Sequence, residues 1–351
     1  MSTIKDVAKR AGVAIATVSA VINRSAPVSE ETALRVGRAI AEIGYMPHGA
    51  AQSLRSGQSK LIGLLIPDIV NPHFATVASV VGTACLKAGY MAAVYSTSED
   101  FDRETQILRM MRWQRVAGLI IIPTRSDEGH GASLLSQIRV PTVLLDSYVD
   151  GLPYDVVKLD NIAAGRIAAE HLIGLGHRRI AVTTGRAGIA TGNDRLAGFE
   201  EVHTKHGLAI DRGLFIPGQF NQAEAYRNTM TLMRRGNCPT AIFALSNMMM
   251  LGVLTALHDL GLKVPGDVSV IGIDDFAFAN IMNPPPTVVA APVAEMAELA
   301  IGKLLSEITS KSVPSGTRQQ YQPSLIVRNS CAAHSSGMLE GRLSRASGLQ
   351  S

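Results

Sequence analysis

Polar side chains follow several apolar segments in the part of the chain beyond residue 60. Asp146 ends the segment PTVLLD and Asp274 ends DVSVIGID, while Asn71 and Asn247 come shortly after LIGLLIP and TAIFALS. Arg195 stands beyond RRIAVTTG. An arginine near an aspartate can grip a carboxylate or a hydroxyl-rich ligand through forked hydrogen bonds. These residue types therefore favour binding of a polar small molecule.

Two aromatic rings and one hydroxyl extend this candidate set. Phe74 and Phe220 follow apolar segments and are placed to pack on the face of a ring, and Thr191 lies near Arg195. The alternative is that each aspartate caps a turn and each phenylalanine belongs to the core. The choice between these interpretations depends on whether the segments bring the residues together.

No signature of an enzyme is present in the sequence. It has no phosphate-binding P-loop, no nucleophile elbow and no pair of histidines at metal-binding spacing. Asp127, Glu128 and His130 suggest a metal site, but we expect them in a polar loop with too few ligands. The sequence therefore predicts no catalytic residue, no metal and no cofactor.

Apolar strands and helical stretches alternate from residue 61 onward. This βαβ rhythm predicts parallel sheets covered by helices on both faces. Ligands bind such sheets beyond the carboxyl ends of the strands, which is where the polar candidates lie. The expected strands fall into a first series, LIGLLIP, MAAVYST, GLIIIP and PTVLLD, and a second series, YDVVKLD, RRIAVTTG, LFIPGQF, TAIFALS and DVSVIGID.

The first residues of the chain, TIKDVAKRAGVAIATVSAVIN, predict two short helices separated by a turn. Thr3 and Asp6 have the spacing of a capping box, and Gly12 supplies the permissive backbone that ends the first helix. VSEETALRVGRAIAEIGYMP predicts a third helix that ends at Gly44, before Pro47. The alternative to a DNA-binding helix-turn-helix is a plain helical hairpin capping a larger domain.

Charge is concentrated at this end of the chain. Residues 1–60 hold eight lysines and arginines against four acids, so the whole formal net charge of +4 lies there. A basic end on a neutral body favours contact with phosphates. Three scattered cysteines indicate a reducing compartment, and the lack of a signal segment or a membrane-length apolar run predicts a cytoplasmic protein without membrane contact.

The sequence resembles the lacI family of bacterial transcription regulators. Its headpiece carries TIKDVAKRAGV, TVS, VIN, VSEET and IGYMPHGAAQSLRSG, and its body carries GLLIPDIVNPHF, VAGLIIIP, DNIAAG, GHRRIAV, DRLAGF, TAIFALSN and GLKVPGDVSVIGIDDF. The resemblance implies a small all-α DNA-binding headpiece followed by an α/β two-lobed domain that resembles periplasmic binding proteins and has parallel sheets. It also implies three crossings between lobes, which bring the helix near Val293–Ile308 to the first lobe.

We therefore expect four parts: a helix-turn-helix headpiece at 1–46, a hinge at 47–58, an effector-binding and dimerisation domain at 59–332, and a disordered tail at 333–351. The resemblance implies that Leu54 wedges into the DNA minor groove from a hinge helix, with Arg55 beside it; the alternative is a flexible linker. The DNA-binding residues expected are Thr3, Ile15, Ala16, Thr17, Ser19, Ala20, Asn23, Leu54 and Arg55. The effector-binding residues expected are Asn71, Phe74, Asp146, Thr191, Arg195, Phe220, Asn247 and Asp274.

The chain departs from the family pattern in two places. Ala14 stands where an N-cap hydroxyl is frequent, and the base-reading positions Ile15, Ala16 and Ala20 cannot hydrogen-bond to bases, although they can contact thymine methyls. Met248 stands where an acid is frequent. Phosphate contacts and DNA bending are therefore expected to carry more of the selectivity.

Taken together, the sequence predicts a ligand-responsive transcription regulator, most readily a repressor, that binds a palindromic operator in double-stranded DNA as a homodimer. By resemblance the effector is a sugar or sugar acid, with nucleobases and other small metabolites left open. The sequence does not decide between a dimer and a tetramer or between repression and activation. It also leaves open whether the effector is an inducer or a corepressor. A transporter's solute-binding protein would leave residues 1–57 unexplained, and an enzyme has no motif to support it.

Overall fold

The computed structural model describes residues 2–23, 25–45, 59–235, 238–310 and 316–334. The chain divides into two compact units, residues 1–60 and residues 61–351. The hinge expected at 47–58, with Leu54 and Arg55, lies outside the described residues. Throughout the described ranges, no helix combines the length and the apolar character needed to cross a membrane.

The first unit contains the three expected helices, α1 (Ile4–Ala11), α2 (Ile15–Asn23) and α3 (Glu30–Ile43). The Asp6 carboxylate accepts hydrogen bonds from the Thr3 backbone N–H and from Thr3 Oγ1, both at 2.8 Å, which stabilises the start of α1. The helices share a small apolar core around fully buried Val7, Val18 and Val36. The predicted three-helix unit is confirmed.

Glycines end two of these helices as the sequence predicts. Gly12 follows α1 with φ of 63° and Gly44 follows α3 with φ of 59°, both in the left-handed region that favours glycine. Backbone N–H groups beyond each helix then bond back to its last carbonyls. The turn between α1 and α2 is therefore built into the sequence.

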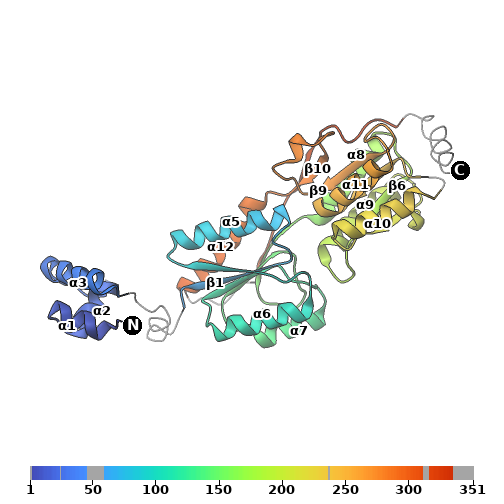
Figure 1. Cartoon of the computed structure of the whole chain (residues 1–351). Helices are drawn as coiled ribbons and strands as arrows, with labels where there is room; N and C mark the ends of the chain where they lie inside the picture. The colour runs from blue at the N-terminus through green and yellow to red at the C-terminus, as the bar shows by residue number, and fades with distance from the viewer. Residues whose placement is uncertain (1, 24, 46–58, 236–237, 311–315, 335–351) are drawn as a thin grey trace. The chain divides into compact units, whose positions relative to one another are not determined.

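The second unit consists of two lobes, each built on a six-stranded sheet (Figure 1). The first sheet has the order β11-β5-β4-β3-β1-β2 and all its pairings are parallel. Its strands are β1 (Leu61–Ile66), β2 (Met91–Ser96), β3 (Gly118–Ile121), β4 (Thr142–Asp146), β5 (Asp155–Leu159) and β11 (Arg318–Tyr321).

The second sheet has the order β12-β10-β9-β8-β6-β7, and only its edge pairing of β10 with β12 is antiparallel. Its strands are β6 (Ile180–Thr184), β7 (Phe215–Pro217), β8 (Ala241–Ala244), β9 (Ser269–Ile273), β10 (Thr287–Ala290) and β12 (Ser324–Ile326). The two parallel-dominated sheets confirm the fold class predicted from the sequence.

Helices cover both faces of each sheet, which explains why the strands are apolar on both sides (Figure 1). In the first lobe α5 and α12 lie on one face and α6 and α7 on the other, while in the second lobe α8 packs with α9 and α10 with α11. Their bounds are α5 Pro72–Lys87, α6 Phe101–Trp113, α7 Glu128–Gln137, α8 Asn161–Gly174, α9 Ala190–Lys205, α10 Gln222–Met233, α11 Asn247–Asp259 and α12 Val293–Ser310.

The chain crosses between the lobes three times, after β5, after β10 and between β11 and β12. The second crossing returns α12 to the first lobe, where it packs on α5 and β4, as the resemblance implied. One assignment from the sequence was wrong: β5 belongs to the first sheet. It pairs in parallel with β4 after a connection without a helix, so the alternation of strands and helices misplaced it.

The second lobe also extends past the expected boundary at residue 332. The backbone N–H of His334 donates to the Leu175 carbonyl at 2.8 Å, and the Ala332 N–H donates to Ser269 Oγ at 3.1 Å. These contacts anchor the last described residues to the lobe.

Two glycines allow α8 and α9 to pack in backbone contact. A Cβ at Gly165 would lie 2.0 Å from the Arg195 carbonyl oxygen, and a Cβ at Gly198 would lie 2.1 Å from the Ile162 carbonyl oxygen. No side chain fits at either position without moving the helices apart. This close approach fixes the position of α9 against α8, and therefore the position of Arg195.

We predict that Gly198→Ala destabilises the second lobe by roughly 1–3 kcal/mol, because overpacking forces two helix backbones apart. Gly174→Ala on α8 is the matched control, since a Cβ there meets nothing within 4 Å. Thermal unfolding measures both. Equal melting temperatures for Gly198→Ala and the parent would contradict the close packing of α8 on α9.

Candidate functional site

A cavity of about 280 Å³ lies between the two lobes, at the carboxyl ends of the strands of both sheets. This is the position at which open α/β sheets bind ligands. Seven of the eight expected effector residues line it: Asn71, Phe74, Asp146, Thr191, Arg195, Phe220 and Asp274. The eighth, Asn247, is fully buried and is not part of the lining. It donates a hydrogen bond to Asn71, which lines the cavity.

Unusual backbone conformations concentrate around this cavity. Among the residues that the structure describes, seven other than glycine have positive φ, and six of them line the cavity: Ser98, Glu99, Asp146, Gln219, Phe220 and Asp274. Residues with side chains adopt this conformation at an energetic cost, and such costs persist mainly at functional sites. The backbone therefore marks the cavity independently of its side chains.

His73 is the central polar residue of the cavity. It lies in the first turn of α5, and its side chain is only 4% exposed. Its Nε2 lies 3.3 Å from a carboxylate oxygen of Asp146 in the first lobe, and its Nδ1 lies 3.2 Å from one of Asp274 in the second. The imidazole is therefore paired with a carboxylate of its own lobe, and its ion pair with Asp274 joins the two lobes.

The two carboxylates determine the charge of this ring. Burial by itself would lower the pKa of His73, but the charge of Asp274 and the contacts with Asp146 outweigh it and raise the pKa to about 10. Burial would likewise raise the pKa of Asp274, but the nearby charge of His73 holds it below its usual value. His73 is therefore an imidazolium between two carboxylates at neutral pH.

Asn247 and Asn71 form a second connection between the lobes, and Arg195 is held within the second lobe. Arg195 donates from Nε to Asn161 Oδ1 at 2.8 Å and from Nη1 to the Leu245 carbonyl at 2.6 Å, which fixes its orientation. Asn247 donates from Nδ2 to Asn71 Oδ1 across the lobes at 2.8 Å. Arg195 is thus held in place by the protein itself.

Two aromatic rings supply the apolar part of the lining. Phe220 lies against Gly185 and Gly192, where a Cβ at either glycine would come within 3.0 Å of the ring. Phe74 packs edge-on against His73, with ring centroids 5.0 Å apart. A ligand in this cavity meets ring faces as well as charged groups, a combination that suits a molecule with both apolar and polar faces.

The rim carries a third link between the lobes. Arg186, in the loop before α9, donates to the Glu99 carbonyl at 2.6 Å, and its Nε lies 3.6 Å from the Glu99 carboxylate. Burial raises the pKa of Glu99, and Arg186 opposes that shift. Ion pairs thus connect the lobes at the mouth as well as the centre of the cavity.

His73, Glu99 and Arg186 were missed from the sequence. His73 lies in NPHF between two residues that were selected, so its position alone would have included it. Glu99 and Arg186 lie in loops without a motif, and only the pairing of the lobes brings them together. Trp113 at the end of α6 is 82% exposed, because the buried face of this helix is formed by Glu104, Ile107, Leu108 and Met111.

The expectation of a polar loop at Asp127, Glu128 and His130 was also wrong. Asp127 caps α7, and Glu128 and His130 lie in its first turn. Among the described residues, no group of three histidine, cysteine or acidic side chains is arranged to hold a metal ion.

The headpiece presents the first half of α2 as its candidate DNA surface. Ile15 and Ala16 are exposed, and Thr17, Ser19 and Ala20 are half-buried, while Val18 faces the core. Thr3 caps α1, and Asn23 ends α2. The surface of α2 is therefore as apolar as the sequence predicts, with hydroxyls at its margin.

These two units define a protein in which a small helix-turn-helix headpiece is joined to a two-lobed ligand-binding body. Residues 3–48 match the family of bacterial regulatory proteins called lacI, and residues 169–331 match the periplasmic binding protein-like domain. The repressor PurR of Erwinia tasmaniensis is 35% identical over 333 residues, which cover 95% of this chain and 97% of that protein. The chain therefore belongs to the lacI family, whose relatives here are transcriptional repressors and not enzymes.

Further relatives agree in sequence and in fold. The ribose operon repressor of Escherichia coli is 34% identical, over 94% of this chain and all of its own. The lac repressor dimer bound to operator and an anti-inducer superposes with a TM-score of 0.84 at 27% identity, covering 95% of this chain and 99% of that one. An Enterococcus faecium regulator with bound ribose superposes with a TM-score of 0.69 at 25% identity, covering 78% and 100%.

We predict that the contribution of His73 to stability depends on pH. Its pKa in the folded protein lies above that of the unfolded chain, so its stabilisation is complete below about pH 6.5 and is lost as the pH rises through about 10. His73→Gln should therefore lie a few kcal/mol below the parent at pH 7, with a gap that shrinks towards pH 10.

Denaturant unfolding at several pH values measures this gap. His171→Gln is the control, because burial lowers the pKa of His171, in the direction opposite to the shift of His73. A gap for His73→Gln that stays constant from pH 7 to pH 10 would rule out the ion pairs described here.

Proposed function

We propose that this protein is a repressor whose affinity for a palindromic operator is controlled by a small molecule in the cavity between its lobes. The observation that carries the proposal is the convergence of seven expected effector residues on one cavity in a chain with a lacI-family headpiece. Because relatives of this family regulate transcription, the same arrangement supports a cytoplasmic protein that acts on the chromosome.

In this proposal the headpiece supplies DNA contacts of two kinds. Ile15, Ala16 and Ala20 meet thymine methyls in the major groove, and Thr3, Thr17, Ser19 and Asn23 contact phosphates or their surroundings. The hinge at 47–58 places Leu54 as a wedge in the minor groove, with Arg55 beside it. The positive charge of residues 1–60 supports this assignment.

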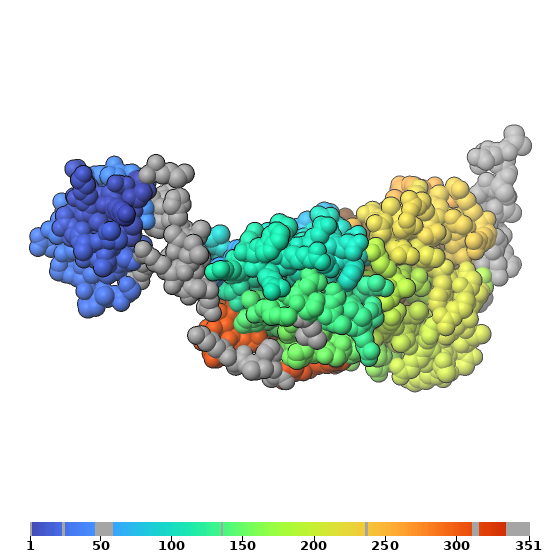
Figure 2. Space-filling view, turned by 90° about the horizontal axis from the view of Figure 1, so that it is seen from below, coloured from blue at the N-terminus to red at the C-terminus, as the bar shows by residue number. Residues whose placement is uncertain are grey.

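A homodimer brings two headpieces to the two halves of a palindrome. The first lobe offers a surface for it. The edge strand β2 exposes the large apolar side chains of Met91 and Val94. The helices on either side of it expose Leu86 on α5 and Met110 and Trp113 on α6. An unpaired strand edge beside apolar side chains favours burial against another chain. Figure 2 shows the outer face of this lobe over α6 and α7.

The cavity supports a sugar, a sugar acid or a related polar ring as the effector. Asp146, Asp274 and Glu99 offer acceptors, Arg195 and Arg186 offer donors, and two phenylalanines offer ring faces. Related structures contain ribose or cellobiose, which is consistent with this class. A thermal-shift screen of sugars, sugar acids and nucleobases identifies the ligand as the compound that raises the melting temperature.

We predict that Leu54→Ala and Arg195→Ala separate the two activities. Leu54→Ala should weaken operator binding at least about tenfold, because the hinge loses its wedge, and should leave the ligand-induced thermal shift unchanged. Arg195→Ala should abolish the thermal shift and leave ligand-free operator binding within about threefold. Electrophoretic binding to the palindrome beside the protein's own gene measures the first activity. An operator affinity for Leu54→Ala equal to that of the parent would disprove the hinge wedge.

We predict that Met91→Glu weakens self-association on the order of tenfold or more, since it places a charge on the unpaired edge strand. Val327→Glu is the matched control, because Val327 is 62% exposed on the other lobe and outside the surface around β2. Sedimentation velocity at several concentrations measures the dimer. An unchanged dissociation constant for Met91→Glu would exclude this surface from the dimer.

A further inference from the structure

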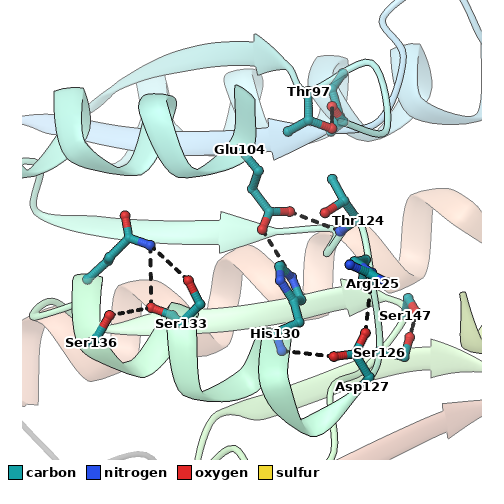
Figure 3. A network of polar contacts seen from close by, with 12 residues as sticks. Thr97, Glu104, Thr124, Arg125, Ser126, Asp127, His130, Ser133, Ser136 and Ser147 are labelled. Carbon is teal, nitrogen blue, oxygen red and sulfur yellow. Dashed lines mark hydrogen bonds and ion pairs between the residues drawn. The ribbon is translucent and has the colours of Figure 1, made fainter. Parts of the chain in front are cut away.

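A buried carboxylate and a buried histidine face each other on the outer layer of the first lobe. Glu104 on α6 is fully buried and His130 on α7 is 2% exposed, and His130 Nε2 lies 3.0 Å from Glu104 Oε1 (Figure 3). Neither side chain lines the cavity. A buried carboxylate destabilises the folded protein unless it is paired and hydrogen-bonded. Glu104 therefore depends on the contacts that it makes inside the lobe.

The pair holds both ends of a short loop. The second carboxylate oxygen of Glu104 accepts a hydrogen bond from the Thr124 backbone N–H at 2.9 Å, where the loop leaves β3. At the other end, the His130 backbone N–H donates to Asp127 Oδ1 at 3.0 Å, so that Asp127 caps α7. Figure 3 shows Glu104 and His130 pointing towards each other, beside the loop of Thr124–Asp127.

The middle of this loop is hydrogen-bonded to the second lobe. Ser126 donates from its backbone N–H to the Gly188 carbonyl at 2.9 Å, and its Oγ accepts the Ala190 N–H at 3.0 Å. Ala190 is the first residue of α9, and Ile189 before it has no side-chain oxygen to cap the helix. Ser126 therefore caps α9 from the other lobe, satisfying a helix N–H that α9 itself cannot satisfy.

We propose that Glu104 and His130 are positioning residues for the cavity. They hold the loop of Thr124–Asp127 in the position from which Ser126 caps α9. Thr191 and Arg195, which line the cavity, lie on α9. The pair thereby connects α6, on the outer face of the first lobe, to the side chains that face the ligand. The importance of this connection for regulation rests on the proposed function, but the connection itself does not.

Hydrogen exchange of the full-length chain, without ligand or DNA, tests the proposal. Glu104→Leu should raise exchange at residues 124–127 and also at Ala190, on the order of tenfold, although Glu104 does not touch the second lobe. Glu104→Gln keeps an acceptor for Thr124 and should restore most of the protection. Ser126→Ala should raise exchange at Ala190 while Thr124 stays protected.

Asp155→Val is the matched control. Asp155 is likewise a buried carboxylate of the first lobe. It accepts a hydrogen bond from the Thr317 backbone N–H and forms an ion pair with Lys303. It is the first residue of β5, at the end of the strand away from the cavity. This variant should leave Ala190 protected. Should Glu104→Leu not fold, His130→Leu removes the partner of Glu104 and is expected to give the same exchange pattern.

Two outcomes would overturn the proposal. One is wild-type protection of Ala190 in Glu104→Leu or in Ser126→Ala. The other is an equal loss of that protection in Asp155→Val, which would mean that any destabilised first lobe loosens α9. Since no effector or operator takes part, either outcome leaves the proposed repressor function intact, and failure of that function leaves this result intact.

Discussion

The contact on which the rest of the second unit depends is the imidazolium of His73 between Asp146 and Asp274. It places one positive charge between carboxylates from two lobes, and none of the three side chains is more than 12% exposed. Charges in such surroundings interact strongly and tolerate little displacement. The relative position of the lobes at the cavity is therefore set by polar contacts of fixed length and not by apolar packing alone.

The same residues have two tasks. Asp274 and Asn71 connect the lobes, and they also line the cavity in which we propose that the effector binds. A ligand that forms hydrogen bonds with these groups must alter the contacts between the lobes. The positive φ of Asp146 and Asp274 adds a backbone cost that the folded lobes sustain. In the proposed function, ligand binding and lobe position are thus linked through shared atoms, as a two-state switch requires.

The sequence predicted the helices and strands better than it predicted which of them pair or pack together. Apolar runs located β1 and β9, and Gly12 and Gly44 located the ends of helices, because these signals are local. The sheet that contains β5 could not be read from the sequence, since a strand's alternation with helices does not identify its neighbour. The role of His73 was missed for the same reason, because it arises from Asp146 and Asp274, which approach it from distant parts of the chain.

The most direct test of the account is a titration of the ligand found by thermal shift, with and without a palindromic operator, by calorimetry on the full-length protein. The account predicts ligand dissociation constants that differ by roughly 5- to 150-fold, and an equal factor between the operator dissociation constants with and without ligand. Equal ligand affinities with and without operator would contradict the claim that the cavity controls the headpiece.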